Sequence, residues 1–525
     1  MSELATQPAP AETQAAERRS ENWPLALGIL IIGMFMSVLD VSIVNVAVPA
    51  IQKDFGAATE DIQWIVTAYS LMLGVIVPLS GWLGDRVGLN RAYLLSLLGF
   101  SVGSALCGFA WSLPSLVLFR VVQAVPGGLL PVITLTMVYR IVPKEKIGTA
   151  MGIYGLGVVF APAVGPTLGG YLVEYQNWRL IFFINVPIGL AGAALAFFLL
   201  RKFPPMPVGR LDVWGFVTIA SGLFALLLAL SKGQDWGWGG YRVLMLIAAS
   251  ASLLALFVVI ELTTERPLID VRIFRKWQLT ISLVLIFVLY LGFFAVVYYL
   301  PQFLQTGQHL TPLHTGLVLL PEAVAMGALM PIAGQLFDRI GPRVPATAGL
   351  LIAAFAAYLL SGITADLTQR NVVIWTWLTG IGTGLAIMPV MTAGLAVLPE
   401  ENDGDGSTAT NLMQRVGVAL GLPMLTALAN SLQEQTMSDR GSLLPPNNPQ
   451  SPAELRQMAD QGVSGTFPLY ERTHLSAMAS SYSNVFLLIA VLSVLAALLA
   501  LTLKAPSTGQ ADSQPAGQPP TGAPA

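Results

Sequence analysis

The sequence predicts an all-α polytopic membrane protein, with two six-helix bundles and two extra central helices, fourteen transmembrane helices in all. Three observations lead to this prediction. Hydrophobic residues make up 54% of the chain and charged residues only 11%, against about 25% charged residues in soluble domains. Apolar runs of about 20 residues, long enough to span a bilayer, recur along the chain. A short motif appears once in each half of the sequence.

Composition and charge exclude several classes of protein. The formal net charge is -2 and there is no basic patch, so nucleic-acid binding is not favoured. No His/Cys/Glu spacing indicates a metal site, a nucleophile or another enzymatic centre, and no cofactor is expected. The single cysteine, Cys107, cannot form an internal disulfide. An integral membrane protein that is not an enzyme is the class that remains.

The fourteen helices are assigned to apolar runs that end at charged or Gly/Pro-rich breaks. The thirteenth run is the most polar, because it carries Asn411, Gln414 and Arg415. In chain order the predicted helices are 25–50, 62–82, 92–111, 114–138, 148–172, 180–201, 212–231, 241–261, 279–303, 313–336, 345–364, 372–398, 406–430 and 484–504.

These runs divide the chain into predicted domains. The polar first segment and the Ala/Pro/Gly/Gln-rich last segment are expected to be disordered cytoplasmic tails. The predicted organisation is a tail at 1–22, a first bundle at 25–202, two linker helices at 211–262, a cytoplasmic connection at 263–278, a second bundle at 279–504 with an extracytoplasmic loop at 430–483, and a tail at 505–525.

The distribution of Lys and Arg predicts the orientation. If the N-terminus is inside, the inner segments hold most of these residues and the short outer loops hold few. The positive-inside rule therefore places both termini in the cytoplasm. We expect a multi-pass protein of the cell (inner) membrane.

An internal repeat connects the two bundles. The segment Gly81–Gly88 (GWLGDRVG) recurs as Gly334–Gly341 (GQLFDRIG), each time after the second helix of a group and on the predicted inner side. Several transporters are built from repeats related by an axis along the membrane normal, with a central binding site between them. The repeat therefore predicts a transporter.

Two acids lie within apolar helices. Asp40 sits in the uncharged stretch 25–50, where a charge near the bilayer centre costs at least roughly 2.5–3.5 kcal/mol. It should face a protein interior or a wet cavity, and it is the leading candidate for a proton site. Glu322 lies about nine residues, roughly 14 Å, into the tenth helix. It is either a second protonatable or cation-recognising carboxylate, or an acid that is protonated or hydrogen-bonded near a boundary.

Aromatic and polar residues of the ninth helix could line a substrate cavity, since aromatic faces attract lipophilic cations. Helical aromatic stripes also arise from ordinary packing, which is the alternative. The cavity candidates, including two polar residues of the first bundle, are Asn45, Gln123, Tyr290, Tyr298, Tyr299 and Gln302.

Four local patterns stand out: the run around Asp40, the repeated motif at Gly81–Gly88, Arg120 with Gln123 on helix four, and the glycines from Gly152 to Gly170 on helix five. Together they resemble the major facilitator superfamily, and more narrowly its fourteen-helix drug:proton antiporter branch of EmrB- and QacA-type multidrug exporters. The first is the helix-one run around Asp40, with Ser42 and Val48 as departures. The second is the loop motif that the resemblance assigns to a cytoplasmic gate, with Gly81, Asp85, Arg86, Gly88 and Arg91 in the first copy and Asp338 and Arg339 in the second.

The other two patterns lie on helices four and five. Leu116, Arg120 and Gln123 match the helix-four pattern, although Ala124 replaces its glycine, and the resemblance implies a role for Arg120 in the proton pathway. The helix-five antiporter motif, in which Ala161 replaces one glycine, accompanies export in relatives. Its matching residues are Gly152, Gly165, Pro166, Gly169 and Gly170.

The resemblance implies proton-coupled efflux of amphipathic small molecules by alternating access, with Asp40, Arg120 and Glu322 as proton-coupling candidates. In Gram-negative relatives a periplasmic adaptor protein extends the path, so the 430–483 loop is either a docking surface or a variable loop without a partner. A same-fold exporter of a specific metabolite, lipid or siderophore is the main alternative. An importer and a non-transporting scaffold or sensor are more distant ones.

Overall fold

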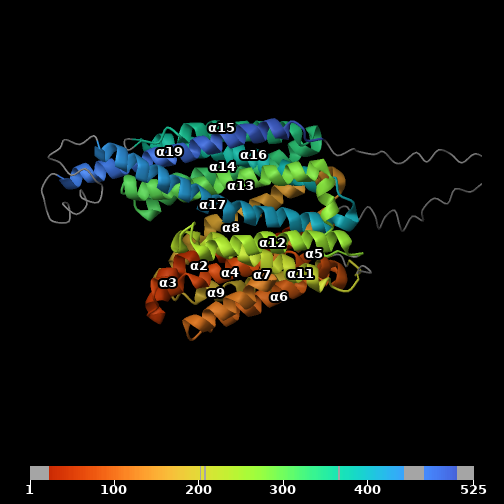
Figure 1. Ribbon diagram of the computed structural model, residues 1–525. Coiled ribbons are helices and arrows are strands. Elements are labelled where there is room, and N and C mark those ends of the chain that lie inside the picture. Colours follow the sequence, from red (N-terminus) through yellow and green to blue (C-terminus); the bar gives the residue numbers. More distant parts are fainter. Residues whose placement is uncertain are drawn as a thin grey trace, which may run out of the picture.

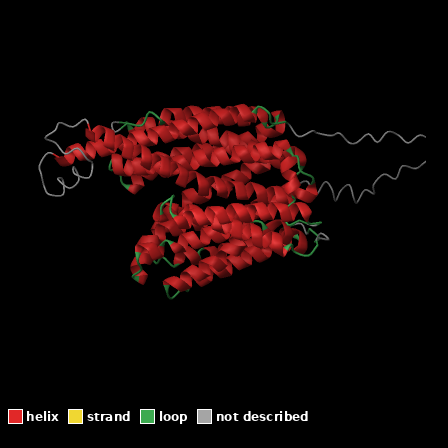
Figure 2. Ribbon diagram, in the orientation of Figure 1, coloured by secondary structure: helices red, strands yellow, loops and turns green. Residues whose placement is uncertain are grey.

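The computed structural model describes residues 23–200, 203–205, 209–265, 267–364, 367–442 and 466–504. In these ranges the regular elements are all helices, as Figure 2 shows. Thirteen helices are long and apolar enough to cross a membrane, or fourteen if one bent pair forms a single span. The predicted all-α polytopic fold is confirmed. The two expected tails, 1–22 and 505–525, lie outside the described residues.

The first half of the chain packs around α2 and α7. α2 lies against α8, α7 and α10, while α6 packs on α7 and α10, and α4 packs on α7. The elements of this half are α2 (Trp23–Phe55), α3 (Thr59–Ile62), α4 (Trp64–Ile76), α5 (Leu79–Val87), α6 (Leu89–Gly108), α7 (Leu113–Ile141), η1 (Lys144–Lys146), α8 (Ile147–Tyr175), α9 (Leu180–Phe183) and α10 (Asn185–Leu199).

The second half repeats these neighbour relations. α13 lies against α17 and α16, while α15 packs on α16 and α19, and α14 packs on α16. Figure 1 shows the two halves as layers, with α13–α19 above α2–α12. The elements are η2 (Val271–Arg275), α13 (Trp277–Gln302), η3 (Phe303–Gly307), α14 (Pro312–Ile340), α15 (Arg343–Leu360), α16 (Gln369–Leu395), η4 (Glu400–Asn402), α17 (Asp403–Ser442) and α19 (Thr466–Ala500).

Between the halves in sequence lies a helical hairpin formed by α11 (Val213–Trp236) and α12 (Tyr241–Thr263). The two helices pack on each other, and α11 also contacts α4 of the first half and α17 of the second. α12 keeps large apolar side chains exposed, among them Leu244, Met245 and Val259. Such a surface suits the hydrocarbon region of a membrane.

The halves meet chiefly where α8 packs on α14, with further contacts of α17 with α5 and α7. A Cβ on Gly155 of α8 would lie 2.6 Å from the sulfur of Met330 and 3.1 Å from Cε of Met388. These methionines belong to a hydrophobic core that runs through both halves. The small residue on α8 therefore permits the close approach of the two layers.

The second predicted helix, 62–82, is broken. The segments Glu60–Ile76 and Leu79–Val87 meet at a bend of 60°, at Val77 and Pro78. Proline lacks the N–H that would continue the helix ladder. The motif expected as a loop is instead helical up to Val87, and Gly88, with φ of 91°, makes the turn. Gly341 ends α14 in the same way, with φ of 79°, a conformation that glycine adopts without strain.

The predicted loop 430–483 is largely a pair of helical extensions, which corrects the sequence interpretation. α17 continues to Ser442 and α19 begins at Thr466; only 443–465 of this interval lie outside the described residues. The added part of α17 contains Leu432, Gln433, Glu434 and Met437, all good helix formers. α17 and α19 also pack on each other, so polarity alone does not end these helices.

Candidate functional site

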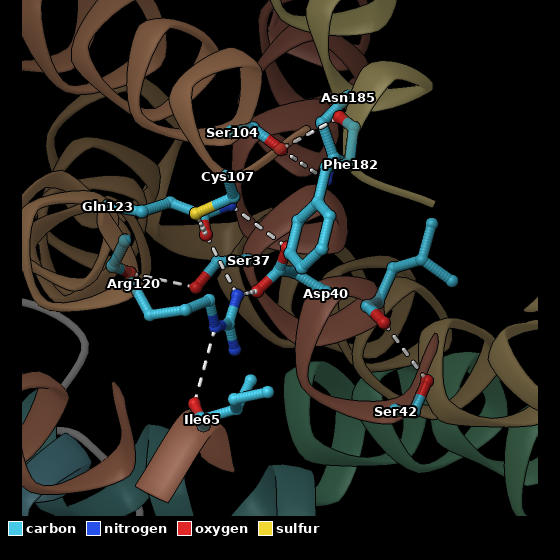
Figure 3. A network of polar contacts seen from close by, with 12 residues as sticks. Ser37, Asp40, Ser42, Ile65, Ser104, Cys107, Arg120, Gln123, Phe182 and Asn185 are labelled. Atoms are coloured by element: carbon cyan, nitrogen blue, oxygen red, sulfur yellow. Dashed lines mark hydrogen bonds and ion pairs between the residues drawn. The ribbon is translucent and has the colours of Figure 1, made fainter. Parts of the chain in front are cut away.

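Asp40 lies on α2, is fully buried and is held by donors from two other helices (Figure 3). Nη1 of Arg120 donates to Oδ2 of Asp40 at 2.5 Å. Nε2 of Gln123 donates to Oδ1 at 2.9 Å, and Nδ2 of Asn185 donates to the same oxygen at 3.3 Å. The predicted interior position of this acid is therefore what the structure has, and the carboxylate is both charge-compensated and hydrogen-bonded.

Arg120 and Gln123 reach Asp40 together because residues three apart lie on one face of α7. Nη1 of Arg120 also donates to Oε1 of Gln123 at 2.8 Å, and its Nε donates to the carbonyl of Ile65 at 3.5 Å. The guanidinium carbon lies 3.6 Å from the ring centroid of Tyr69 on α4. Arg120 is thus a buried cation fixed by a carboxylate, an amide, a carbonyl and an aromatic face.

A second layer of polar groups fixes these partners. Nδ2 of Asn185 donates to Oγ of Ser104 at 3.1 Å, and that hydroxyl donates to the carbonyl of Phe182 at 2.8 Å. Sγ of Cys107 donates to Oε1 of Gln123 at 3.5 Å. A buried charge pair depends on such bonds, because breaking it from one side costs about 3–5 kcal/mol.

The helix-five motif lies on α8 and brings other backbones close. A Cβ on Gly165 would overlap Oγ of Ser42, and one on Gly169 would lie 2.8 Å from Cγ1 of Ile43. These two residues follow Asp40 on α2 by two and three positions. Gly152 instead faces α14, where a Cβ would lie 2.6 Å from Cα of Pro331. Gly170 has no neighbour within 4 Å. The side chain of Pro166 lies outside the described part of the chain.

The second copy of the repeated motif joins the two halves. Asp338 at the end of α14 accepts hydrogen bonds from the N–H of Gly148 at 2.8 Å, the N–H of Thr149 at 2.9 Å and the hydroxyl of Thr149 at 2.7 Å. A carboxylate at the beginning of α8 is favoured by the helix dipole. We call these contacts of Asp338, Gly148 and Thr149 the latch, and the end of the molecule that contains it the latch end.

The first copy makes a related contact at the beginning of α17. Nη2 of Arg140 donates to Oδ1 of Asp85 at 3.3 Å, and Nε of Arg140 lies 3.9 Å from Oδ2 of Asp403. A Cβ on Gly81 would lie 3.6 Å from the backbone of Gly404. Three further motif residues have exposed side chains: Arg86, Arg91 and Arg339.

Glu322 is not part of the Asp40 cluster. It lies on α14 and is only 4% exposed, and its Oε1 has no hydrogen-bond partner among the residues that the structure describes. Its backbone carbonyl abuts Gly380 of α16. Among the described residues, the second half therefore holds a buried acid whose Oε1 lacks a hydrogen-bond partner, whereas the acid of the first half is paired.

The cavity candidates do not form one cluster. Tyr299 is buried in the core of the second half and bonds to Thr426 at 2.9 Å, and Gln302 accepts a hydrogen bond from Tyr482 at 2.9 Å. Tyr290 stacks on Phe294 with ring centroids 6.3 Å apart. Tyr298 is 39% exposed, Asn45 is exposed, and Gln123 belongs to the Asp40 cluster.

Sequence reasoning missed several residues of these sites. Asn185 stood within an apolar run at the start of the sixth helix, and Arg140 counted only as an inner positive charge. Tyr69 gave no signal, because its role depends on how α4 is rotated against α7.

Residues 30–422 match the family model of the Major Facilitator Superfamily. The tetracenomycin C resistance and export protein of Streptomyces glaucescens is 31% identical over 507 residues, covering 94% of this chain and 93% of that protein. An uncharacterised MFS-type transporter of Bacillus subtilis, YhcA, is 32% identical over 475 residues and 89% of each chain.

Other relatives include the lincomycin resistance protein LmrB of Listeria monocytogenes, which is 30% identical over 79% of this chain and 88% of its own length. Among solved structures, the human organic anion transporter MFSD10 aligns with a TM-score of 0.58 at 15% identity, over 93% of this chain and 100% of that one. The proton:xylose symporter XylE aligns with a TM-score of 0.57 at 13% identity, over 90% and 95%. These two similarities concern the fold alone.

Proposed function

We infer that this chain, which belongs to the Major Facilitator Superfamily and is a membrane transporter rather than an enzyme, exports amphipathic drugs or related small molecules in exchange for protons. The relatives whose names state resistance to tetracenomycin C and lincomycin support the substrate class. The observation that carries the proton coupling is the buried Asp40, which meets Arg120 and two amides in the first half.

Asp40 supplies the charge change that coupling needs. When the carboxylate is ionised, Arg120 compensates it and Gln123 and Asn185 satisfy its oxygens. When it binds a proton, Arg120 loses its counter-charge and the cluster becomes net positive. A cationic substrate near this cluster is then bound less tightly, so proton binding from one side and substrate release on that side go together.

The latch indicates which end of the transporter is closed in this structure. In this structure, Asp338 of the second half is hydrogen-bonded to the first half at the latch end, where both motif copies lie. We propose that this end is cytoplasmic, as the Lys and Arg distribution predicts, and that the protein lies in the cell membrane with both termini inside. The state described is then closed to the cytoplasm. Export requires the latch to open for substrate binding and to close before release.

Glu322 is the proposed recognition group of the second half. Oε1 of this buried acid has no hydrogen-bond partner in the part of the chain that the structure describes, so the acid gains most from a ligand that brings its own positive charge. We propose that it attracts the cationic end of amphipathic substrates, while Asp40 carries the proton. Docking of a periplasmic adaptor on the extensions of α17 and α19 stays a prediction.

The test is transport by the purified protein in liposomes with an imposed pH gradient, with ethidium as a fluorescent lipophilic cation. Asp40→Asn should abolish gradient-driven movement and retain exchange of ethidium without a gradient. Asp54→Asn is the matched control. Asp54 lies on the same helix as Asp40, but it is at the C-terminal end of α2 and its side chain is 45% exposed. Full gradient-driven export by Asp40→Asn would disprove the assignment of Asp40. Gradient-driven uptake in place of export would show an importer.

A further inference from the structure

Two acids of the inserted hairpin face each other where α11 begins and α12 ends. Asp212 directly precedes α11, and Glu261 lies in the last turn of α12. A Cβ placed on Gly215 would lie 2.6 Å from Oε1 of Glu261 and 2.7 Å from Oδ2 of Asp212. Because both distances start from one point, the two oxygens lie no further apart than the sum of these distances. We call Asp212 and Glu261 the carboxyl pair.

Glu261 is a buried acid with one oxygen that lacks a donor. The residue is 1% exposed, and its Oε2 accepts a hydrogen bond from the N–H of Leu268 at 2.8 Å. Its Oε1, the oxygen on the side of Asp212, has no hydrogen-bond partner in the described part of the chain. Leaving a buried acceptor without a donor is costly. Water is kept away by a buried apolar cluster that contains Leu268 together with Ile219, Leu223, Phe257 and Ile269.

Asp212 offers a second acceptor that lacks a strong donor. Its Oδ1 caps α11 by accepting from the N–H of Gly215 at 2.8 Å. Its Oδ2 lies 3.5 Å from the hydroxyl of Thr264. That hydroxyl has a single hydrogen and lies closer to the carbonyl of Ile260, at 2.8 Å. A hydrogen atom between Oδ2 of Asp212 and Oε1 of Glu261 would therefore satisfy both oxygens.

The charges around the carboxyl pair favour a proton at this place. Two neighbouring carboxylates repel each other when both are ionised, and neither acid of the pair is in an ion pair within the described ranges. The described charged residues on the adjoining segments are Arg210 before α11, Glu265, Asp270, Arg272 and Arg275 after α12, and Asp403 and Asp405 at the beginning of α17.

The cations among these residues do not compensate the pair. The three arginines have exposed side chains, and the guanidinium of Arg272 contacts the carbonyl of Leu262 at 3.4 Å. Asp403 lies 3.9 Å from Arg140. The other side chains that are not exposed, Asp270 and Asp405, are acids. Because no group of acids, histidines and cysteines suited to a metal ion occurs among the described residues, a proton is the cation that fits.

The carboxyl pair is tied to the second half through the segment that follows α12. Glu261 holds the N–H of Leu268, and slightly further along the chain the N–H of Asp270 donates to Oδ2 of Asp405 at 3.3 Å. Asp405 lies in the first turn of α17, and its Oδ1 would lie 3.7 Å from a Cβ on Gly81 of the first motif copy. The pair therefore acts on the segment that reaches the beginning of α17 at the latch end.

We propose that the carboxyl pair binds one proton and thereby fastens the segment after α12 to the hairpin. In the protonated pair, the O–H at Oε1 of Glu261 donates to Oδ2 of Asp212, and Oε2 accepts from Leu268. Loss of the proton leaves two like charges side by side. Glu261 then turns toward water and releases the N–H of Leu268, so the segment loosens beside the beginning of α17. The site is separate from Asp40, and in the orientation proposed above it responds to cytoplasmic pH.

The test is hydrogen–deuterium exchange of the peptide that contains Leu268, in the full-length protein in lipid nanodiscs. It needs neither a substrate nor a gradient, so its outcome is independent of the role of Asp40. The exchange rates are corrected for the chemical rate at each pH. Protection of this peptide in the parent protein should then fall by roughly 10–100-fold from acidic to alkaline buffer, the size expected when a buried hydrogen bond is lost.

Two variants imitate the pair without its second charge. Glu261→Gln should keep the peptide protected at every pH, because its amide can donate to Asp212 while its oxygen accepts from Leu268. Asp212→Asn removes the other charge and keeps a good helix cap, so it should stay protected as well. Glu265→Gln is the matched control, since Glu265 is an exposed acid of the same segment, and its exchange should follow that of the parent.

Three results would overturn the inference. The first is protection that does not change with pH in the parent protein. The second is the parent's pH dependence retained in Glu261→Gln and in Asp212→Asn, since the proton would then bind elsewhere. The third is protection at alkaline pH that returns when sodium is added, which would assign the pair to a metal cation. If Glu261→Gln does not fold, Asp212→Asn decides between these outcomes at the same peptide.

Discussion

Removal of the Asp338 carboxylate should shift the equilibrium between the closed and open latch. Asp338 accepts three hydrogen bonds from the beginning of α8, at 2.8, 2.9 and 2.7 Å. Each hydrogen bond to a charged group contributes about 1.5–3 kcal/mol when desolvated. Asp338 is half-buried, so solvent screening reduces the total.

We therefore expect Asp338→Ala to destabilise the closed latch by about 2–3 kcal/mol, which is roughly a 30–150-fold change in the equilibrium constant. Asp338→Asn should lose less, since one amide oxygen can still accept. Thr149→Val removes only the hydroxyl contact and should cost about 0.5–1.5 kcal/mol.

The assay is a distance measurement across the latch end by double electron–electron resonance. Labels at Glu145→Cys, just before α8, and Val344→Cys, at the beginning of α15, sit on opposite halves, and both positions are exposed. In lipid nanodiscs Asp338→Ala should add a long-distance population that is minor in the parent protein, with Thr149→Val in between. An unchanged distance distribution in Asp338→Ala would refute the idea that this carboxylate holds the halves together.

Three further predictions concern packing and stability. Gly165→Leu should lower the melting temperature and abolish transport, because the leucine side chain would collide with Ser42 and overpacking costs about 1–3 kcal/mol. Gly170→Ala is the control and should be tolerated, since Gly170 has no neighbour within 4 Å. If both substitutions lowered the melting temperature equally, the interpretation of the motif as a packing motif would be wrong. Tyr93→Phe removes a hydroxyl that accepts from the N–H of Gly33 at 3.1 Å and donates to the carbonyl of Ile29 at 2.8 Å. The free energy of unfolding, measured by thermal unfolding, should fall by about 1–3 kcal/mol, and export should be unchanged. Asp54→Asn weakens the contacts with Trp178 and Arg179 at a partly exposed site. It should lower the free energy of unfolding by less than about 1 kcal/mol. A larger loss, measured by thermal unfolding, would contradict the idea that solvent screens this ion pair.

The sequence predicted the fold class and the central acid because both depend on one-dimensional signals. The length of an apolar run identifies a membrane-spanning helix. An acid such as Asp40 inside such a helix must face the protein interior or a water-filled cavity. Arg120 and Gln123 were also predictable as a pair, because a spacing of three places them on one helix face.

The remaining features depend on how helices are rotated and bent against each other. Asn185 and Tyr69 reach Asp40 and Arg120 from α10 and α4, and no periodicity in the sequence encodes that meeting. The bend at Pro78 and the helix α5 that follows it were not predicted, because the repeated motif was expected to be a loop. Helix formers such as Leu432 and Glu434 extended α17 beyond the apolar run that predicted it.

The position of α11 has a mechanical consequence. Because this helix touches α4 on one side and α17 on the other, any rotation of the two layers must make at least one of them slide along it. The inserted hairpin thus provides a surface that both layers contact. In the proposed alternating-access cycle, the stiffness of this hairpin therefore sets part of the resistance to movement of the layers.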